Sequence, residues 1–365
     1  MRRFAKCGEL AISLIPTMQI GVDSFVATAK SGPTGDVARV QELLEQIELA
    51  DQVGLDVFGV GEHHRPDYVS SAPAVLLAAA AARTKRIRLA SAVTVLSSDD
   101  PVRVFQQFAT LDLISQGRAE IIVGRGSFIE SYPLFGFDLE DYDELAAEKL
   151  DLLLKIRAQT NVTWSGRHRA ALAGQGIYPR PLQTPLPVFI GVGGTPQSAM
   201  RAGTLGLPLI VAIIGGQPAQ FRPLVDLYRA AWTKAGHPPE KLFVGVHNIG
   251  FLGDTTAEAL ETFWPAYRDA FGKIGKERGW PPPTRPQFDA QCSPHGALMV
   301  GDADLVAAKI ISEHKALGGL SRVNILIDNR VLTHRQIMHA IELLGTRVAP
   351  LVKKELDSPA APRPA

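Results

Sequence analysis

The densest group of titratable side chains in the sequence is Glu62-His63-His64-Arg65, directly after an apolar run at residues 56–61. A lone histidine more often serves local structure, but this grouping at the end of a predicted strand favours catalysis, because imidazole exchanges protons near neutral pH. Adjacent strand residues point to opposite sides, so His63 and His64 are poorly placed to share a metal ion. We therefore interpret one histidine as an acid or base and the other as its support, and we expect no metal site.

A second group of residues is suited to binding an anion. Arg125 lies between two glycines, which lets a ligand approach the backbone beside a permanent positive charge. Gly193, Gly194, Thr195 and Ser198 fall between another apolar run and a helical pattern, where hydroxyls and free backbone N–H groups bind phosphate or carboxylate. No Gly-Lys-Ser/Thr follows, so this is not a P-loop. We expect Arg125 and this turn, on neighbouring strands, to hold one anion together.

Eight short runs rich in β-branched residues alternate with helical patterns and must position these groups. They lie at about residues 18–26, 56–61, 87–95, 119–124, 186–191, 207–214, 242–252 and 323–328. Most are apolar throughout, which is typical of parallel strands buried on both faces. Eight strand–helix units predict an α/β fold of the (β/α)8 TIM-barrel type with insertion loops, whose active site forms at the carboxyl ends of the strands. An open doubly wound sheet is the alternative, but no Gly-rich dinucleotide turn follows the first strand.

Helix boundaries are marked by capping residues, prolines and glycines. Asp36 precedes an apolar stripe that Gly54 ends, and Ser71-Ala72-Pro73 and Asp99-Asp100-Pro101 are typical of helix starts. Two stretches break the alternation, at residues 158–185 and 275–300. Loops of this length in a compact barrel are usually lids or binding loops, so we expect the second to lie over the catalytic face.

The 365 residues are predicted to form one domain instead of two. Residues 1–17 are expected to be an N-terminal extension and not a secretory signal, because the apolar run is short and no cleavage site follows. Residues 18–350 form the predicted barrel, and residues 351–365 are expected to be a C-terminal tail, since the Pro-rich end cannot sustain a helix or strand.

Composition excludes several classes of partner. Lys and Arg number 38 and Asp and Glu 37, so a net charge of +1 gives no attraction to nucleic acid or to an anionic membrane. No stretch of 18 uncharged apolar residues is present. The two cysteines, Cys7 and Cys292, cannot form a disulfide framework, which suits the cytoplasm. A single Cys-x-x-His spacing, Cys292 to His295, is interpreted as a loop.

At residues 54–136 the chain resembles the bacterial luciferase-like flavin monooxygenase family, and weaker similarity extends this to nearly all of residues 18–350. The matching segments are Gly54-Leu55-Asp56, Glu62-His63-His64, Arg86-Ile87-Arg88-Leu89, Ser91-Ala92-Val93-Thr94-Val95-Leu96, Asp100-Pro101-Val102-Arg103, Leu111-Asp112-Leu113-Ile114-Ser115-Gln116-Gly117-Arg118 and Gly124-Arg125-Gly126. This combination is specific for the family and not for any one substrate.

The resemblance implies a barrel that uses reduced FMN and dioxygen to oxidise a small organic substrate. His63 matches the family's catalytic histidine, Arg125 its phosphate-binding arginine, and Thr195 and Ser198 its phosphate-binding hydroxyls. A cis peptide bond under the flavin ring is implied for Ala92-Val93. No second domain is expected to bind a nicotinamide, so a separate flavin reductase would supply the reduced cofactor. The resemblance also implies a homodimer, for which the apolar helices at residues 73–82 and 101–114 could supply the interface.

Three points remain open at this stage. Luciferases carry a cysteine where this chain has Gly124, so neither light emission nor an aldehyde substrate is predicted. A sister branch of the family uses a deazaflavin for hydride transfer, and a non-catalytic flavin carrier is a further alternative, although a carrier would not need Glu62-His63-His64. Candidate residues for the substrate pocket are Phe128, Tyr132, Phe135, Trp164, His247 and His295.

Overall fold

Eight parallel strands form a closed barrel in the computed structural model, which describes residues 18–28, 32–126 and 128–357. In order around the barrel they are β1 (Gln19–Ser24), β2 (Val57–Val60), β3 (Arg88–Ser91), β5 (Ala119–Gly124), β8 (Val188–Val192), β9 (Leu209–Ile213), β10 (Val244–Leu252) and β12 (Arg322–Leu326). Because β12 pairs with both β10 and β1, the barrel has no open edge. The predicted (β/α)8 fold is confirmed, and the doubly wound alternative is wrong.

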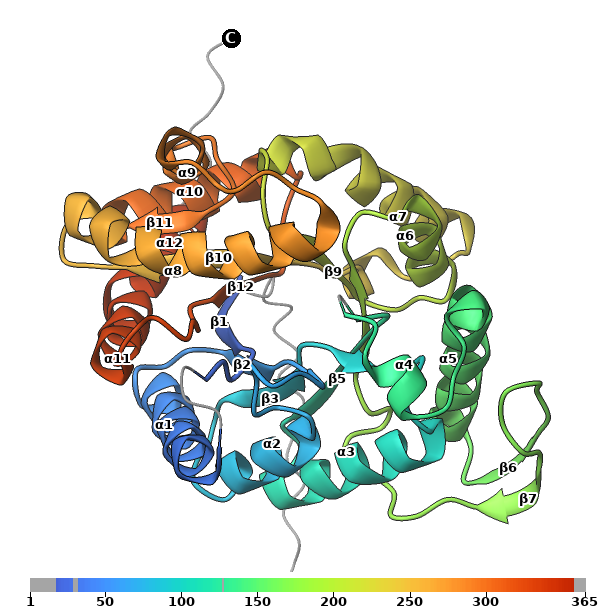
Figure 1. Ribbon diagram of the computed structural model, residues 1–365. Helices are drawn as coiled ribbons and strands as arrows, with labels where there is room; N and C mark the ends of the chain where they lie inside the picture. The colour runs from blue at the N-terminus through green and yellow to red at the C-terminus, as the bar shows by residue number, and fades with distance from the viewer. Residues whose placement is uncertain (1–17, 29–31, 127, 358–365) are drawn as a thin grey trace, which may run out of the picture.

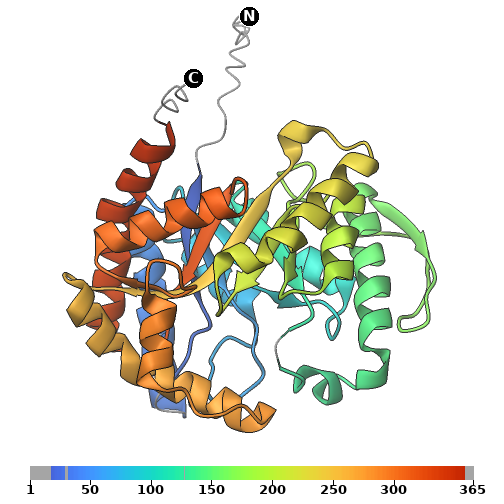
Figure 2. The same ribbon diagram turned by 90° about the horizontal axis from the view of Figure 1, so that it is seen from above.

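A ring of helices surrounds the strands, as the view along the barrel shows (Figure 1). The longer helices are α1 (Pro33–Gln52), α2 (Pro73–Ala81), α3 (Pro101–Ser115), α5 (Tyr142–Ala158), α6 (Pro196–Thr204), α7 (Arg222–Lys234), α8 (Thr256–Arg278), α9 (Arg285–Cys292), α10 (Ala303–Ala316), α11 (His334–Leu343) and α12 (Ala349–Asp357). The short elements are helix α4 (Ser131–Leu134) and strands β4 (Thr94–Val95), β6 (Asn161–Trp164), β7 (Leu172–Gly176) and β11 (Met299–Gly301). Seen from the side, the gold-to-orange helix α8 lies at the end of the barrel opposite the start of β1 (Figure 2).

The predicted helix boundaries are correct in part. Gly54 follows α1 with a φ of 82°, a left-handed conformation that favours glycine. At the start of α3 the Asp100 carboxylate accepts hydrogen bonds from the N–H groups of Val102 and Arg103, so the predicted cap is present. The start of α2 differs, because Ala72 is the capping residue and no side chain caps this helix.

The two long insertions contain secondary structure of their own. In the first, β6 and β7 pair as an antiparallel hairpin, which lies outside the ring of helices (Figure 1). The second contains the last turn of α8, helix α9 and strand β11. Strand β11 pairs in parallel with the carboxyl end of β10. Neither insertion is therefore a structureless loop.

The C-terminal boundary predicted at residue 350 falls inside helix α12 (Ala349–Asp357). Val352 is fully buried, so this helix packs on the barrel. The proposed extension at residues 1–17 and the Pro-rich end at residues 358–365 lie outside the described residues. In the part of the chain that the structure describes, no helix is long and apolar enough to cross a membrane.

The barrel interior changes from charged to apolar along its axis. At the amino ends of the strands, Arg322 binds Glu120 through Nη1 at 2.7 Å and Nη2 at 3.1 Å, and Arg88 also binds Glu120. Above this ionic layer, apolar side chains of different sizes fill the barrel; they are Val57, Ala90, Ile122, Phe189 and Ile210. These two layers close the amino end and leave the carboxyl end for a cavity.

The ionic layer is largely buried from solvent and is held by charge pairing. Arg322 is 1% exposed and Glu120 2%. Burial alone raises the pKa of Glu120, but the positive charges of Arg322 and Arg88 have the larger combined effect and lower it. The carboxylate therefore stays ionised inside the barrel, and each charge depends on its partner.

Candidate active site

A cavity of about 590 Å³ occupies the carboxyl end of the barrel. Seven of the eight predicted site residues border it; they are His63, Ala92, Val93, Arg125, Gly193, Thr195 and Ser198. The eighth, Gly194, does not. These residues come from four different strand ends, and the parallel barrel brings them together because all its strands end on one side.

His63 lies in an aromatic pocket directly after β2. Its ring contacts the edge of Phe25, with ring centres 4.6 Å apart, and packs against Tyr68 at 4.5 Å and Phe128 at 5.4 Å. Its Nε2 atom is buried and has no hydrogen-bond partner among the described residues. Burial, and secondarily the charges of His64 and Arg65, lower the pKa of His63 to about 3. The sequence interpretation of a histidine that titrates near neutral pH is therefore wrong, because this ring is neutral at that pH.

This lowered pKa predicts a pH-dependent stability. The pKa of His63 is about 3 in the folded protein and near the ordinary 6.5 in the unfolded chain. Between these values the unfolded chain binds a proton that the folded protein does not, so the free energy of unfolding decreases as the pH falls below about 6.5. Above that pH neither state is protonated, and His63 has no effect. The expected slope from this one group is about 1.4 kcal/mol per pH unit.

Urea unfolding of the wild type and of His63→Asn at several pH values between about 5 and 8 measures this effect. The wild type should lose more stability than the variant on the acid side, and the two should run parallel above neutral pH. Parallel curves throughout would contradict the neutral, buried state of His63.

Glu62 and His64 support the site from behind His63. His64 Nε2 lies 2.9 Å from Glu62 Oε1, and the N–H of Val95 donates to Glu62 Oε2 at 2.9 Å. The His64 ring packs against Phe135 and does not border the cavity. The two histidines thus point to different sides, as predicted, and Glu62 connects the end of β2 to β4.

The peptide bond between Ala92 and Val93 is cis, as the family resemblance implies. Two glycines make room for Val93 beside it. A Cβ atom on Gly124 would lie 2.6 Å from Val93 Cγ2, and one on Gly191 would lie 2.9 Å from Val93 Cγ1. A larger residue at position 124 would therefore displace Val93, which gives Gly124 a packing reason independent of any family pattern.

Arg125 and the turn after β8 meet as predicted, because β5 and β8 are paired neighbours. Arg125 Nη2 donates to Thr195 Oγ1 at 3.0 Å, and Nη1 binds Asp143 at 2.5 Å. Thr195 is the capping position of α6, yet its side chain makes no capping bond to the helix. A Cβ atom on Gly193 would touch nothing within 4 Å, so the backbone there is open. The cluster of Arg125, Thr195, Ser198 and the start of α6 is hereafter called the anion cradle.

One further histidine faces the cavity with a carboxylate partner. His247 Nδ1 lies 2.6 Å from Asp23 Oδ2, and Asn324 Nδ2 donates to Asp23 Oδ1 at 2.7 Å. The sequence interpretation named His247 only as a lining candidate and did not identify Asp23. A signal was present, since Asp23 is the one charged residue of β1 and lies next to its buried apolar residues.

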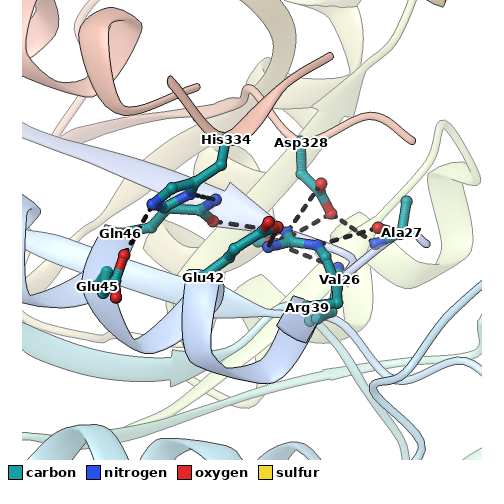
Figure 3. Close-up of polar contacts among 9 residues, drawn as sticks. Val26, Ala27, Arg39, Glu42, Glu45, Gln46, Asp328 and His334 are labelled. Carbon is teal, nitrogen blue, oxygen red and sulfur yellow. Dashed lines mark hydrogen bonds and ion pairs between the residues drawn. The ribbon is translucent and has the colours of Figure 1, made fainter. Parts of the chain in front are cut away.

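Phe25 contacts both cavity histidines, and the residues that follow it in the chain are held by bonds around Asp328, which Figure 3 shows. Asp328 Oδ2 accepts from the N–H of Ala27 at 2.8 Å, and Arg39 Nη2 binds Oδ1 at 3.0 Å. Arg39 Nε also donates to the carbonyl of Ala27 at 3.0 Å. The Phe25 ring contacts His63 on one side and stacks on His247, 5.9 Å away, on the other. The chain after β1 therefore contacts both imidazoles.

Helix α8 forms the wall over the cavity. Phe263, Tyr267, Ala270, Phe271 and Ile274 border the cavity from this helix. Three ion pairs attach α8 to the rim: Arg65 with Glu277, Lys273 with Asp67 at 2.8 Å, and Arg330 with Asp269 at 2.6 Å. The covering element is therefore a helix that starts well before the predicted segment 275–300.

The predicted lining is correct for only part of the candidates. Phe128 and His247 border the cavity, whereas Tyr132, Phe135, Trp164 and His295 do not. Tyr132 and Trp164 are buried in packed regions away from it. Within 275–300, Glu277, Arg278 and Trp280 border the cavity, and helix α9 does not.

Two groups outside the cavity have metal-ligand chemistry. Asp141, Glu144 and His168 lie close enough to share an ion, but Arg167 Nη1 already binds Glu144 at 2.8 Å and neutralises part of the acidic charge. Cys292 is the last residue of α9 and is buried, which raises the pKa of its thiol to about 12. The Cys292 to His295 spacing therefore supplies no reactive thiolate.

The geometry agrees with the comparison of the whole sequence with known families. Residues 18–319 match the luciferase-like monooxygenase family. The chain belongs to this family. Its members among the relatives below include monooxygenases and dehydrogenases that depend on F420, a deazaflavin, so this luciferase-like protein is a flavin-type oxidoreductase.

Relatives of known sequence differ in how much of their length is matched. The 4-hydroxyprotoasukamycin monooxygenase of Streptomyces nodosus subsp. asukaensis is 27% identical over 337 residues, which are 86% of this chain and 87% of that protein. An uncharacterized protein of Sinorhizobium fredii is 32% identical over 60% of this chain and 64% of its own length. The F420-dependent glucose-6-phosphate dehydrogenase of Amycolatopsis mediterranei is 33% identical over 46% of this chain, and the match spans about half, 51%, of that protein.

Two solved structures share the fold. The monooxygenase RslO1 of Streptomyces bottropensis superposes with a TM-score of 0.80 at 24% identity, covering 91% of this chain and 99% of that one. The oxygenating constituent of 3,6-diketocamphane monooxygenase from Pseudomonas putida, solved in complex with FMN, gives 0.74 at 20% identity, covering 92% and 98%. At these identities the similarity establishes the barrel architecture alone.

Proposed function

We propose that this protein is an FMN-dependent monooxygenase that uses reduced flavin and dioxygen to oxidise a small organic substrate. The observation that carries the proposal is the bond between Arg125 and Thr195 at the edge of a cavity that also contains the unpartnered Nε2 of His63. An anion grip and a neutral imidazole thus border one cavity, as a phosphate-bearing redox cofactor requires.

The residues present fit FMN. The anion cradle would hold its phosphate, with Gly193 and Gly194 leaving the backbone accessible. The ring system would lie against Ala92 and Val93, within reach of His63, whose buried Nε2 has no protein partner. Bound reduced FMN would supply the electrons that activate dioxygen.

The protein's own contribution is positioning and the exclusion of water. His63 is neutral, so it can donate or accept one hydrogen bond without adding a charge. Phe25, Tyr68 and Phe128 surround it and keep water away from its ring. A dry, apolar site of this kind protects reactive oxygen chemistry from hydrolysis.

A second candidate function keeps the fold and replaces the cofactor. The relatives that use F420 favour deazaflavin-dependent hydride transfer, a reaction that does not consume dioxygen. The anion cradle would hold a phosphate of either cofactor, so contacts with phosphate alone do not separate the two.

Oxygen uptake separates them. Purified protein is mixed with reduced FMN or with reduced deazaflavin, and binding and dioxygen consumption are followed for each. We expect binding of reduced FMN and oxygen consumption that a substrate accelerates. Tight binding of the deazaflavin without oxygen consumption would refute the FMN proposal.

The cradle itself can be tested by Arg125→Ala. A charge-assisted hydrogen bond to phosphate contributes about 1.5–3 kcal/mol, so the FMN dissociation constant should rise by about ten- to a hundredfold. The affinity for riboflavin, which lacks the phosphate, should change little. Fluorescence titration with both ligands measures this.

Arg167→Ala is the matched control, because Arg167 also pairs with an acidic residue near the start of α5 but does not border the cavity. Its FMN affinity should equal that of the wild type. An equal loss in both variants would mean that Arg125 acts through the general charge of this face and not as a phosphate ligand.

The proposal extends to assembly and supply of the cofactor. A separate reductase would provide reduced FMN, and the protein would act in the cytoplasm as a homodimer. Val75 on α2 is 66% exposed, and Leu113 and Ile114 on the neighbouring α3 are 47% and 46% exposed, which supports an apolar interface there. Light scattering that gives the mass of a single chain at working concentration would contradict the dimer.

A further inference from the structure

Asp23 and His247 form a buried carboxylate–imidazole pair at the floor of the cavity. Asp23 is 1% exposed and accepts from both its neighbours, His247 Nδ1 at 2.6 Å and Asn324 Nδ2 at 2.7 Å. Gly59 leaves the space for this carboxylate, since a Cβ atom there would collide with Asp23 Oδ1. The side chains of Asp23, His247 and Asn324 come from β1, β10 and β12, which are adjacent in the barrel.

The pair fixes the direction of the imidazole. With Nδ1–H donated to the carboxylate, the lone pair of neutral His247 is on Nε2. Nε2 has no hydrogen-bond partner among the described residues, and His247 borders the cavity. A proton taken up at Nε2 would produce an imidazolium whose charge the adjacent carboxylate stabilises.

Other carboxylates around the cavity already have partners. Glu62 binds His64 and the N–H of Val95. Asp328 binds Arg39 and the N–H of Ala27. At the rim, Asp269 binds Arg330, and Asp67 binds Lys273 and Arg330.

His63 differs from His247 although both rings contact Phe25. His63 has positive neighbours in His64 and Arg65 and no carboxylate partner, and its pKa is lowered to about 3. Of the two imidazoles, His247 is therefore the one with a carboxylate partner.

The pair also lies on the substrate side of the cavity. Around the closed barrel, β10, β12 and β1, which carry His247, Asn324 and Asp23, lie opposite β3, β5 and β8, and the anion cradle follows β5 and β8. A cofactor held by Arg125 leaves the side of Asp23 and His247 to the organic substrate. Aromatic side chains border the cavity there; they are Phe25, Tyr267, Phe271 and Trp280.

We propose that the substrate is an aromatic molecule carrying an acidic hydroxyl, a phenol, and that His247 takes the hydroxyl proton. In this step the substrate O–H bond breaks, an N–H bond forms at Nε2, and a phenolate–imidazolium pair results with no change of oxidation state. The negative charge raises the electron density of the ring carbons ortho and para to the oxygen, where an electrophilic oxygen donor attacks. Asp23 and Asn324 are positioning residues. This assignment rests on the proposed oxygenase function.

The test uses 4-nitrophenol, whose absorption moves to longer wavelength when it ionises, with cofactor-free protein at a pH where the free probe is mainly protonated. We expect bound 4-nitrophenol to be the phenolate. In His247→Gln, the bound probe should be the neutral phenol and the dissociation constant about ten- to a hundredfold higher. A neutral bound probe in the wild type, no binding, or an ionised probe in His247→Gln would overturn the proposal.

His247→Gln is suited to this test because the side chain of His247 borders the cavity and does not lie in the packed barrel interior. His339→Gln is the matched control: His339 Nε2 pairs with Asp254 Oδ1 at 2.9 Å on the surface, and its loss should leave probe binding unchanged. Asp23→Asn should raise the pH at which the bound probe ionises, a shift that a purely structural role would not produce.

The two proposals fail in distinguishable ways. Ionisation of the probe without FMN-dependent oxygen uptake would refute the cofactor assignment alone. Oxygen uptake with a neutral bound probe would refute the role of His247 alone.

Discussion

His63→Asn is expected to lower turnover by about 10²–10³-fold, the usual cost of losing one hydrogen bond directed at the reacting atoms, while FMN still binds. The reason is local: His63 Nε2 is buried at the cavity without a protein partner, so a bound ligand is the group left to bond with it. Asparagine preserves polarity, but its shorter side chain does not reach the position of Nε2. Stopped-flow measurement of substrate oxidation with a supply of reduced FMN gives the rate, and fluorescence titration gives the affinity.

His295→Asn is the control for this variant, because His295 is exposed and does not border the cavity. Its turnover should match the wild type. Unchanged turnover in His63→Asn would refute the assignment of His63 and revive the alternative of a non-catalytic flavin carrier.

Glu120→Gln is expected to destabilise the fold by about 3–5 kcal/mol, because it leaves a buried arginine without its counter-charge. Glu120 binds both Arg322 and Arg88, and Arg322 is 1% exposed. The amide keeps the size and some hydrogen bonds, so the loss reports the missing charge. Urea unfolding at neutral pH measures the difference in the free energy of unfolding.

Two further variants serve as controls for this result. Asp226→Asn removes the partner of Arg222 from an exposed pair on α7 and should cost less than about 1 kcal/mol. In Glu120→Gln/Arg322→Met the unpaired buried charge of Arg322 is removed too, so part of the stability should return. A double variant less stable than Glu120→Gln alone would mean that Arg322 matters for its packing and not for its charge. Arg322 does stack on Phe189 and Phe243, 5.0 and 5.3 Å from their ring centres.

The barrel could be predicted from sequence because its strands are apolar on both faces. Few other folds accommodate β-branched runs separated by amphipathic helices. The eight predicted runs overlap the eight barrel strands. His63 and Arg125 followed from the same rule, since each comes directly after such a run and parallel strands end on one side of a barrel. The meeting of Arg125 with Thr195 required only that consecutive barrel strands pair.

The Asp23–His247 pair could not be predicted in this way. The two residues are 224 positions apart, and they meet because β12 joins the first strand to β10 when the barrel closes. Nothing local to either residue specifies that closure or the rotation of the imidazole. The lowered pKa of His63 was also out of reach, because it depends on burial by aromatic rings from three separate segments.

Aromatic residues misled the prediction of the cavity wall. Tyr132 and Trp164 have the chemistry of pocket residues but are buried in packed regions, since large rings contribute as much to a core as to a binding site. The wall is formed instead by α8, whose inward face has the same apolar spacing as a helix that packs on a barrel. Spacing alone does not reveal that a helix covers an empty space.

Because ion pairs attach α8 to the rim of the cavity, this helix affects how the substrate range of such a protein can evolve. The residues of α8 that border the cavity belong to one helix, and the anion cradle belongs to β5, β8 and α6 on the far side of the barrel. Substitutions on the inward face of α8 would alter which molecules are accepted without disturbing the phosphate grip or the barrel strands. New substrate ranges would thus be reachable by successive single changes in one surface helix, each compatible with a folded, cofactor-binding ancestor.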